Sequence, residues 1–177
     1  DSVTSIGDYA FSGCSYLDTV VCNPNLETIG NYAFKNCSGL EAIDLPKKLT
    51  AIGEEAFYDC SSLTSMSIPE GVTRIGTRAF YGCSSLTSIS IPEGMTRIGF
   101  NAFYGCSSLS SVVMADSVTT IGDSAFKDCT NLSDVTMSKK FPGWATMPWS
   151  CTSPRTGASV LTSGIPSTFP APPVTIS

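Results

Sequence analysis

The chain of 177 residues contains no histidine. Histidine is the commonest general acid or base in enzymes and the commonest metal ligand. The sequence also lacks a G-x-S-x-G nucleophile turn, a glycine-rich phosphate loop and the C-x-x-C pairs typical of zinc sites. These absences argue against an enzyme, and we expect neither a cofactor nor a bound metal.

Charge is scarce and mainly acidic. Charged residues make up 14% of the chain, with 10 Lys and Arg against 15 Asp and Glu. Nucleic-acid binding needs clustered basic residues, so we expect no nucleic-acid partner. No apolar run approaches the roughly 20 residues of a membrane span, so none is expected in this segment. The sequence starts at Asp1, with neither an initiator Met nor a signal peptide. This favours a mature product or a fragment.

What the sequence does contain is a repeat of 23 residues. An Ile-Gly pair recurs at Ile6, Ile29, Ile52, Ile75, Ile98 and Ile121. In each unit an Ala-Phe pair, a cysteine and a leucine follow at constant spacing, without an insertion. Repeats of this length cannot bury their apolar edge alone and stack into one continuous core, so the pattern predicts a solenoid.

Within one unit, "LTSISIP" alternates apolar and hydroxylated residues and predicts a short strand, residues 86–92. A second extended piece should direct Met95 and Ile98 inward. The segment "FNAFYGC" is expected to form about one 3₁₀-like turn over Ala102 and Phe103. We therefore predict a right-handed solenoid.

These motifs closely resemble the BspA-type leucine-rich repeat, with its pattern of IGxxAFxxCxxLxxIxIPxxVxx, over about residues 1–140. The resemblance implies a parallel β-sheet on the concave side of the solenoid and short 3₁₀ or extended segments on the convex side. Six repeats would fill residues 1–140, the first of them incomplete. Residues 141–166 are predicted to form a degenerate capping repeat, and residues 167–177 a Pro-rich extended tail.

Six cysteines occupy one repeat position: Cys14, Cys37, Cys60, Cys83, Cys106 and Cys129. Their spacing of about 5 Å would suit a disulfide, but stacked Cβ atoms point in parallel and do not converge. No base lies nearby to activate a thiol. We interpret the six as buried core fillers, a normal role for free cysteine. Cys22 is predicted to be core as well, and Cys151 remains a candidate partner for Cys129.

The outward positions of the predicted strands form a first candidate binding surface. It is a shallow polar surface, with small hydroxyls and acidic groups toward both ends. The alternative is a solvated sheet that only needs polar residues compatible with β-structure. The candidates are Asp18, Glu41, Asp44, Thr64, Ser65, Ser67, Thr87, Ser88, Ser90, Ser110, Ser111, Asp134 and Thr136.

A convex stripe forms the second candidate. Tyr58, Tyr81 and Tyr104 occupy one position in three consecutive units, and Arg74 and Arg97 are also one unit apart. Tyrosine with arginine is typical of contact surfaces. Tyrosine rings can equally serve as lids over the core of a solenoid.

These observations predict a non-catalytic interaction module. The resemblance implies a location outside the cell or on its surface, and adhesion through binding of a host protein, such as a matrix protein, or a glycan. The alternative is a structural subunit that self-associates head-to-tail into a filament or layer, because open solenoid ends invite contacts that do not close.

Overall fold

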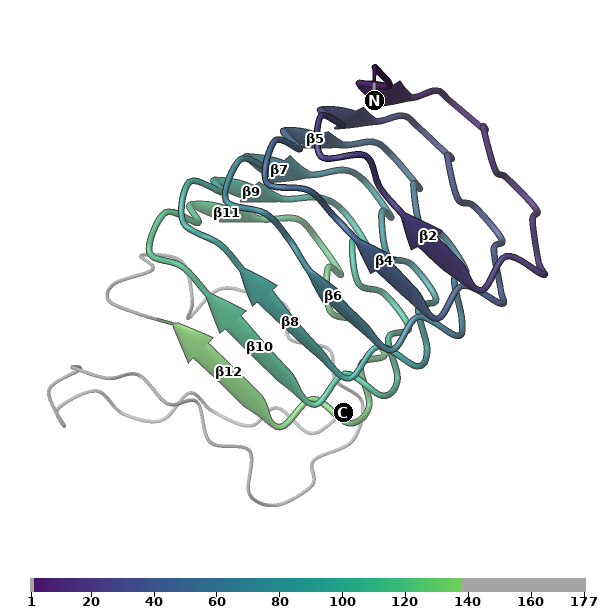
Figure 1. Ribbon diagram of the computed structural model, residues 1–177. Coiled ribbons are helices and arrows are strands. Elements are labelled where there is room, and N and C mark those ends of the chain that lie inside the picture. The colour runs from purple at the N-terminus through teal and green to yellow at the C-terminus, as the bar shows by residue number, and fades with distance from the viewer. Residues whose placement is uncertain (1, 138–177) are drawn as a thin grey trace, which may run out of the picture.

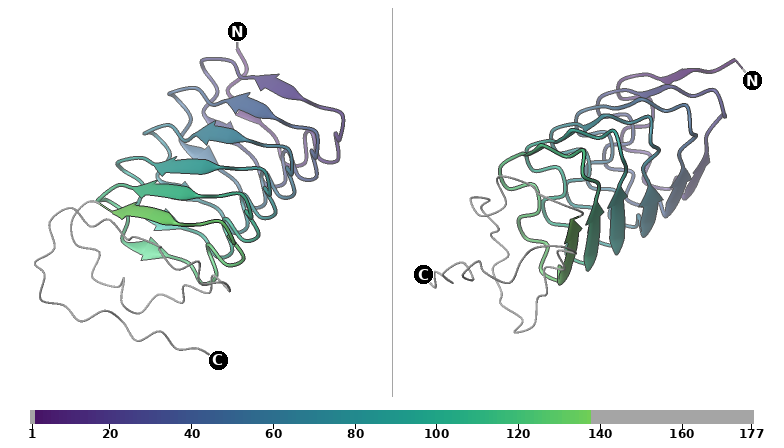
Figure 2. Two further views of the ribbon diagram at one scale, coloured as in Figure 1. Left: turned by 90° about the horizontal axis from the view of Figure 1, so that it is seen from below. Right: turned by 90° about the vertical axis from the view of Figure 1, so that its left-hand side faces the viewer.

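The computed structural model describes residues 2–137, so the predicted capping repeat, the Pro-rich tail and Cys151 lie outside the described residues. The chain winds into a stack of coils, each 23 residues long, with two kinds of strand on its surface (Figure 1). Figure 2 shows the coils stacked along one axis from two further directions. The predicted parallel-strand solenoid is therefore confirmed.

The longer strands hold three or four residues each. They are β2 (Thr19–Val21), β4 (Ala42–Asp44), β6 (Ser65–Ser67), β8 (Ser88–Ile91), β10 (Ser111–Met114) and β12 (Asp134–Met137). β2 pairs with β4, and β6, β8, β10 and β12 form a second sheet in sequence order. All pairs are parallel, and each residue pairs with the one 23 positions away, such as Ser88 with Ser111.

The shorter strands hold two residues each and form one six-stranded parallel sheet. They are β1 (Ser5–Ile6), β3 (Thr28–Ile29), β5 (Ala51–Ile52), β7 (Arg74–Ile75), β9 (Arg97–Ile98) and β11 (Thr120–Ile121). This sheet is the second extended piece that the sequence predicts in each unit. Its isoleucines Ile29, Ile52, Ile75 and Ile98 are buried, while Arg74 and Arg97 are exposed.

The core is a set of columns in which the same residue of each coil lies above its counterpart. The phenylalanines from Phe11 to Phe126 stack with ring centroids 5.2–5.3 Å apart. Phe34, Phe57, Phe80 and Phe103 are completely buried. Burial of these stacked rings adds to the hydrophobic stabilisation from the buried leucine and isoleucine columns of the same core.

The expected 3₁₀-like turn is wrong in detail. In residues 99–106 two kinds of backbone hydrogen bond alternate. Some N–H groups donate to the carbonyl three residues earlier, as Tyr104 N–H donates to Asn101 O, and the N–H groups between them donate to the next coil, as Phe103 N–H donates to Ala125 O. The alternation requires left-handed residues, here Asn101 (φ 53°) and Gly105 (φ 72°). A 3₁₀-helix would direct every amide back along its own coil, so the segment forms successive β-turns instead.

The glycine of the Ile-Gly pair allows the coils to approach closely. A Cβ on Gly76 would lie 2.7 Å from Gly53 O, and one on Gly99 would lie 2.6 Å from Gly76 O. No side chain fits at these distances. The repeated glycine therefore reflects backbone contact between neighbouring coils.

Candidate binding surfaces

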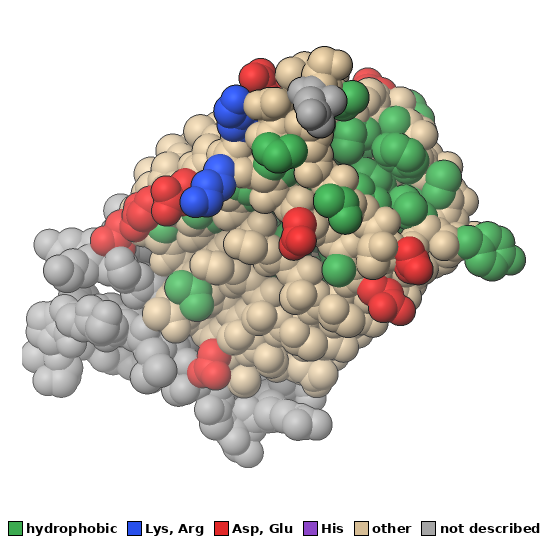
Figure 3. Space-filling view, in the orientation of Figure 1, with side chains coloured by type: hydrophobic (Ala, Val, Ile, Leu, Met, Phe, Trp, Pro, Cys, Tyr) green, Lys and Arg blue, Asp and Glu red, His purple; other side chains and the backbone are tan. Residues whose placement is uncertain are grey.

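We call the outward surface of β2, β4, β6, β8, β10 and β12 the long-strand face. Of the thirteen candidates on this surface, eleven are exposed, while Ser111 and Thr136 are half-buried. Figure 3 shows this face covered mainly by uncharged polar side chains and backbone, with Lys and Arg only along one margin. The side chains point outward as the alternating pattern predicts.

Some of these hydroxyls have a structural role that the sequence analysis missed. Thr64 Oγ1 donates to Glu41 O (3.3 Å), Thr87 Oγ1 to Thr64 O (3.2 Å) and Ser110 Oγ to Thr87 O (3.1 Å). The same carbonyls also accept the backbone N–H of the donating residue. Each hydroxyl thus uses its single proton to join two coils, so only its oxygen lone pairs remain for a ligand.

Four serines on the long-strand face differ from these structural hydroxyls. Ser65, Ser67, Ser88 and Ser90 are exposed, and the structure shows no hydrogen bond from their side chains. Ser65 pairs with Ser88 and Ser67 with Ser90, so the four hydroxyls form a small grid on β6 and β8. This grid can both donate and accept hydrogen bonds.

The tyrosine stripe is a face-to-face stack of half-buried rings. The centroids of Tyr58 and Tyr81 lie 4.7 Å apart, and those of Tyr81 and Tyr104 lie 4.8 Å apart. Lys35 Nζ lies 4.7 Å from the Tyr58 centroid, and Lys127 Nζ lies 5.7 Å from the Tyr104 centroid. Both ends of the stack are therefore covered by a cation, and the rings present only their edges and hydroxyls to a ligand.

Two phenols of the stripe, Tyr58 and Tyr104, have a pKa above the ordinary value of tyrosine. Burial raises the pKa of Tyr58, and the hydrogen bond to Asp128 raises the pKa of Tyr104. Both phenols therefore stay protonated at neutral pH, but Tyr104 gives its single proton to Asp128, so of these two only Tyr58 can donate a hydrogen bond to a partner.

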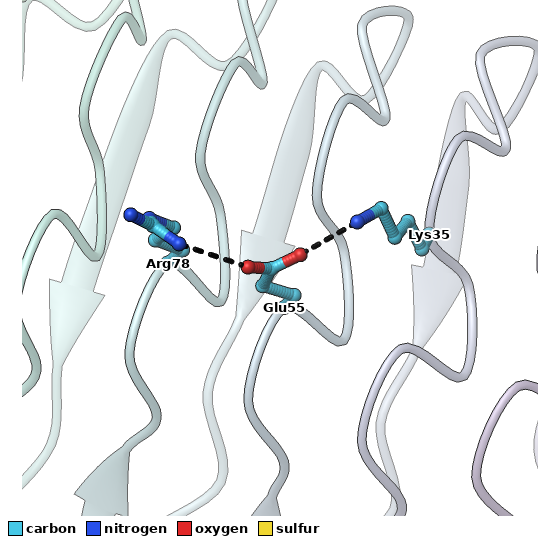
Figure 4. A network of polar contacts seen from close by, with 3 residues as sticks. All are labelled: Lys35, Glu55 and Arg78. Atoms are coloured by element: carbon cyan, nitrogen blue, oxygen red, sulfur yellow. Dashed lines mark hydrogen bonds and ion pairs between the residues drawn. The ribbon is translucent and has the colours of Figure 1, made fainter.

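A network of charges adjoins the stripe (Figure 4). Glu55 accepts from Lys35 Nζ at 2.7 Å and from Arg78 Nη1 at 3.2 Å, so it joins three consecutive coils. Burial alone would raise the pKa of Glu55, but the two cationic donors outweigh it and hold that pKa below its ordinary value. In turn, the hydrogen bond to Glu55 raises the pKa of Lys35.

The sequence analysis also missed Phe100, which is 44% exposed. The Arg78 guanidinium lies 5.9 Å from the centroid of its ring. The equivalent residues of the other five units, Asp8, Asn31, Glu54, Thr77 and Asp123, are all polar. This break in the repeat could have identified Phe100 from the sequence. Next to it, Asn101 Oδ1 is buried without a hydrogen-bond partner.

The structure places Arg74 and Arg97 on the short strands β7 and β9, where they pair directly and are exposed. No ion pair joins either arginine to a carboxylate in residues 2–137. The cations that touch tyrosine rings are instead Lys35 and Lys127. The combined tyrosine and arginine stripe expected from the sequence is thus two features on neighbouring parts of the coil.

The prediction of a buried cysteine ladder holds for five of its six members. Cys37, Cys60, Cys83, Cys106 and Cys129 are buried, but Cys14 is exposed because no described coil covers it. Each buried thiol also donates to a phenylalanine carbonyl of the preceding coil, as Cys83 Sγ does to Phe57 O at 3.2 Å. Cys22, predicted to be core, is only partly buried.

Residues 2–137 contain no group of three or more His, Cys, Asp or Glu side chains placed to hold a metal ion. Within the same range, no helix has the length and apolar character needed to cross a membrane.

Comparison with protein families decides the relationship. The model of the BspA-type leucine-rich repeat region matches residues 1–99 and 52–145, with six copies of the repeat. The chain belongs to this family. The family is generally a non-enzymatic interaction fold. The comparison with curated proteins found no match.

Solved structures of leucine-rich repeat proteins share the fold of this BspA-type chain. A leucine-rich repeat protein of Treponema pallidum is 33% identical, with a TM-score of 0.68, over 75% of this chain and 62% of its own. A leucine-rich cell surface protein of Faecalibacterium prausnitzii is 35% identical, with a TM-score of 0.54, over 76% of this chain and 45% of its own. The pneumococcal vaccine antigen PcpA, 20% identical with a TM-score of 0.59, shares the fold alone. The chain thus spans less than two thirds of the length of the first two proteins.

Proposed function

We propose that the chain is a non-catalytic adhesion module that acts outside the cell or at its surface and binds a protein of a host. Family membership supports an interaction module, and the similarity to a cell surface protein supports the location. We assign the contact to an aromatic patch made of Tyr58, Tyr81, Tyr104, Phe100 and Arg78.

The observation that carries the assignment is the composition and exposure of this patch. Tyrosine and arginine supply much of the energy of protein interfaces, and Phe100 adds an exposed apolar side chain among otherwise polar equivalents. The candidates on the long-strand face are small hydroxyls and carboxylates, and its large exposed apolar side chains are the valines Val21 and Val113, which are weaker anchors than tyrosine or arginine. This face remains a second contact area, where the serine grid can hydrogen-bond a ligand.

A protein partner suits the patch better than a glycan. Sugar rings bind aromatic side chains through the faces of the rings. Here the inner faces stack on one another and the two outer faces carry Lys35 and Lys127. The exposed edges and phenolic hydroxyls instead suit the side chains and backbone carbonyls of a protein.

Binding to immobilised matrix proteins and to mucin, native and deglycosylated, tests the proposal. The double variant Tyr81→Ala and Phe100→Ser should weaken binding by about 30-fold or more, because truncation of an interface anchor costs about 2 kcal/mol. The matched variant Ser67→Ala and Ser90→Ala alters the long-strand face and should change binding less than threefold. Loss of binding in the serine variant alone, or binding that disappears on deglycosylation, would contradict the assignment. No binding to any of these proteins would count against the adhesion module itself.

A further inference from the structure

The outer surface carries two adjacent columns of like charge that the aromatic patch does not use. The acidic column is formed by Glu70, Glu93 and Asp116, each in the turn after a long strand, and Figure 3 shows a line of acidic side chains along that margin. The arginine pair, Arg74 and Arg97, lies four residues further along the same coils, on β7 and β9.

Neither the glutamates of this column nor the arginines are neutralised within the described structure. Glu70, Glu93, Arg74 and Arg97 are all exposed, and no ion pair joins any of them to another residue of 2–137. Within one coil the glutamate lies in the turn and the arginine on the short strand that follows, and the two form no ion pair. The surface therefore presents a negative stripe beside a positive stripe.

Each stripe repels itself. Arg74 pairs directly with Arg97 across β7 and β9. Glu70 and Glu93 occupy equivalent positions of adjacent coils, and the turns that carry them stack, since a Cβ on Gly94 would lie 3.4 Å from Glu70 O. Like charges directly opposite each other on adjacent strands destabilise a sheet. One contact that brings opposite charges to both stripes would relieve both repulsions.

We propose that this surface docks against the same surface of a second copy of the chain, in a parallel dimer. In this dimer the two-fold axis runs parallel to the solenoid axis. The rotation places the negative stripe of one copy opposite the positive stripe of the other, and equivalent coils of the two copies lie at the same level along the axis. Arg74 then faces Glu70 of the partner subunit, and Arg97 faces Glu93 of the partner subunit. The contact is isologous, so the two reciprocal pairs form as well.

The register of this contact follows from the repeat. Both stripes repeat at the same interval, about 4.8 Å between neighbouring strands, because both follow the rise of one solenoid. Each arginine of one copy therefore lies at the same level as a glutamate of the other copy. This lateral contact differs from the head-to-tail self-association expected as the alternative function, which would join the ends of the solenoid.

A second copy fits the charge pattern better than a polyanion or an acidic peptide. An acidic partner would neutralise the arginine pair but would meet the acidic column on the same coils. The net charge of the chain, −5, disfavours it further. Exposed ion pairs are individually weak and are screened by salt, so the dimer should form at high protein concentration and low ionic strength.

Sedimentation velocity at ~20 mM and ~500 mM NaCl tests this proposal, since the Debye length falls from about 20 Å to about 4 Å over that range. The unaltered chain should form a dimer at low salt that dissociates at high salt. Arg74→Glu with Arg97→Glu should leave both stripes negative and the protein monomeric, and Glu70→Arg with Glu93→Arg should leave both stripes positive and monomeric. An equimolar mixture of the two variants should restore the dimer. Glu41→Arg with Asp44→Arg, on the long-strand face, is the matched control and should still dimerise.

A monomer at every concentration, or a dimer that survives either charge reversal, would overturn the proposal, as would a mixture of folded variants that stays monomeric. Circular dichroism establishes that each variant is folded. The orientation is tested with Thr96→Cys in a Cys14→Ala background, because Thr96 is exposed and stands between Glu93 and Arg97 in the chain, and the proposed axis runs between those two residues. This variant should form a disulfide-linked dimer under mild oxidation in a parallel arrangement, and absence of the crosslink contradicts that arrangement. These outcomes are independent of binding to a host protein.

Discussion

At the scale of single residues, Glu55 stands apart. It is the only buried charged side chain among residues 2–137, and its backbone is left-handed, with φ of 50°. A buried carboxylate is costly unless donors surround it. Lys35 and Arg78 provide those donors from the coils on either side. The residue thus connects three coils through side chains, in addition to the backbone ladders.

The variant Glu55→Gln should lower the free energy of unfolding by about 1–2 kcal/mol at pH 7, because it leaves two cations without a carboxylate. The estimate is modest since the side chains of Lys35 and Arg78 are 29% and 42% exposed. The lowered pKa of Glu55 means that its charge stabilises the fold above the ordinary carboxyl pKa, and that this contribution is lost as the pH falls through the lowered value. Urea unfolding at pH 7 and at pH 3 should therefore show a smaller difference between the two proteins at the lower pH.

Glu54→Gln is the control for that experiment, because Glu54 is the exposed neighbour and makes no ion pair in the described structure. It should change stability by less than about 0.5 kcal/mol at either pH. An equal effect of both substitutions would show that net charge, and not the network, accounts for the result.

At the scale of the element, the short strand and the glycine after it set the distance between coils. Gly30, Gly53, Gly76, Gly99 and Gly122 each lie against the backbone of the preceding coil. Gly7 occupies the same motif position, but a Cβ there would meet nothing within 4 Å. The chain therefore holds its own matched comparison for the role of close approach.

Gly76→Ala should lower the free energy of unfolding by about 3 kcal/mol, since a methyl group would force two backbones apart in a packed core. Gly7→Ala should cost less than about 1 kcal/mol, because the same methyl group enters open space. Thermal and urea unfolding of the two variants provide the measurement. Similar costs in the two variants would contradict the role of close contact between coils.

At the scale of the whole molecule, each coil contacts only its neighbours, so stability accumulates along the stack. The cysteine column places one thiol in each coil. Cys14 is exposed, and Cys37, Cys60, Cys83 and Cys106 are buried. Burial raises the pKa of Cys60 and Cys83 far above that of a free thiol. Both access and thiolate formation therefore depend on opening of the coils.

A short pulse of iodoacetamide on the native protein should alkylate Cys14 fully and leave Cys60, Cys83 and Cys106 unmodified, as read by peptide mass spectrometry. In denaturant, the three buried thiols should become reactive together, at the concentration where circular dichroism is lost. Labelling of Cys83 before unfolding, or a disulfide between ladder cysteines, would contradict a reduced and cooperative core.

The solenoid and most of its core follow from the sequence because a strict period leaves few ways to bury the apolar edge of a repeat. The tyrosine column was visible in the same way. Other features depend on geometry that the period does not contain. Thr64 and Ser65 both read as outward hydroxyls, yet only Thr64 reaches a carbonyl of the preceding coil. The network of Glu55 joins residues of three units whose chemistry is not repeated.

The sequence by itself determined the length of the coil, the residues that fill it and the order in which coils stack, because each apolar position recurs at one interval. Only the tertiary structure decided which outward side chains join coils and which remain available to a partner. The physical reason is that a hydroxyl or a charge is free or satisfied according to the atoms of the neighbouring coil. Those atoms come within reach only when the stack has formed.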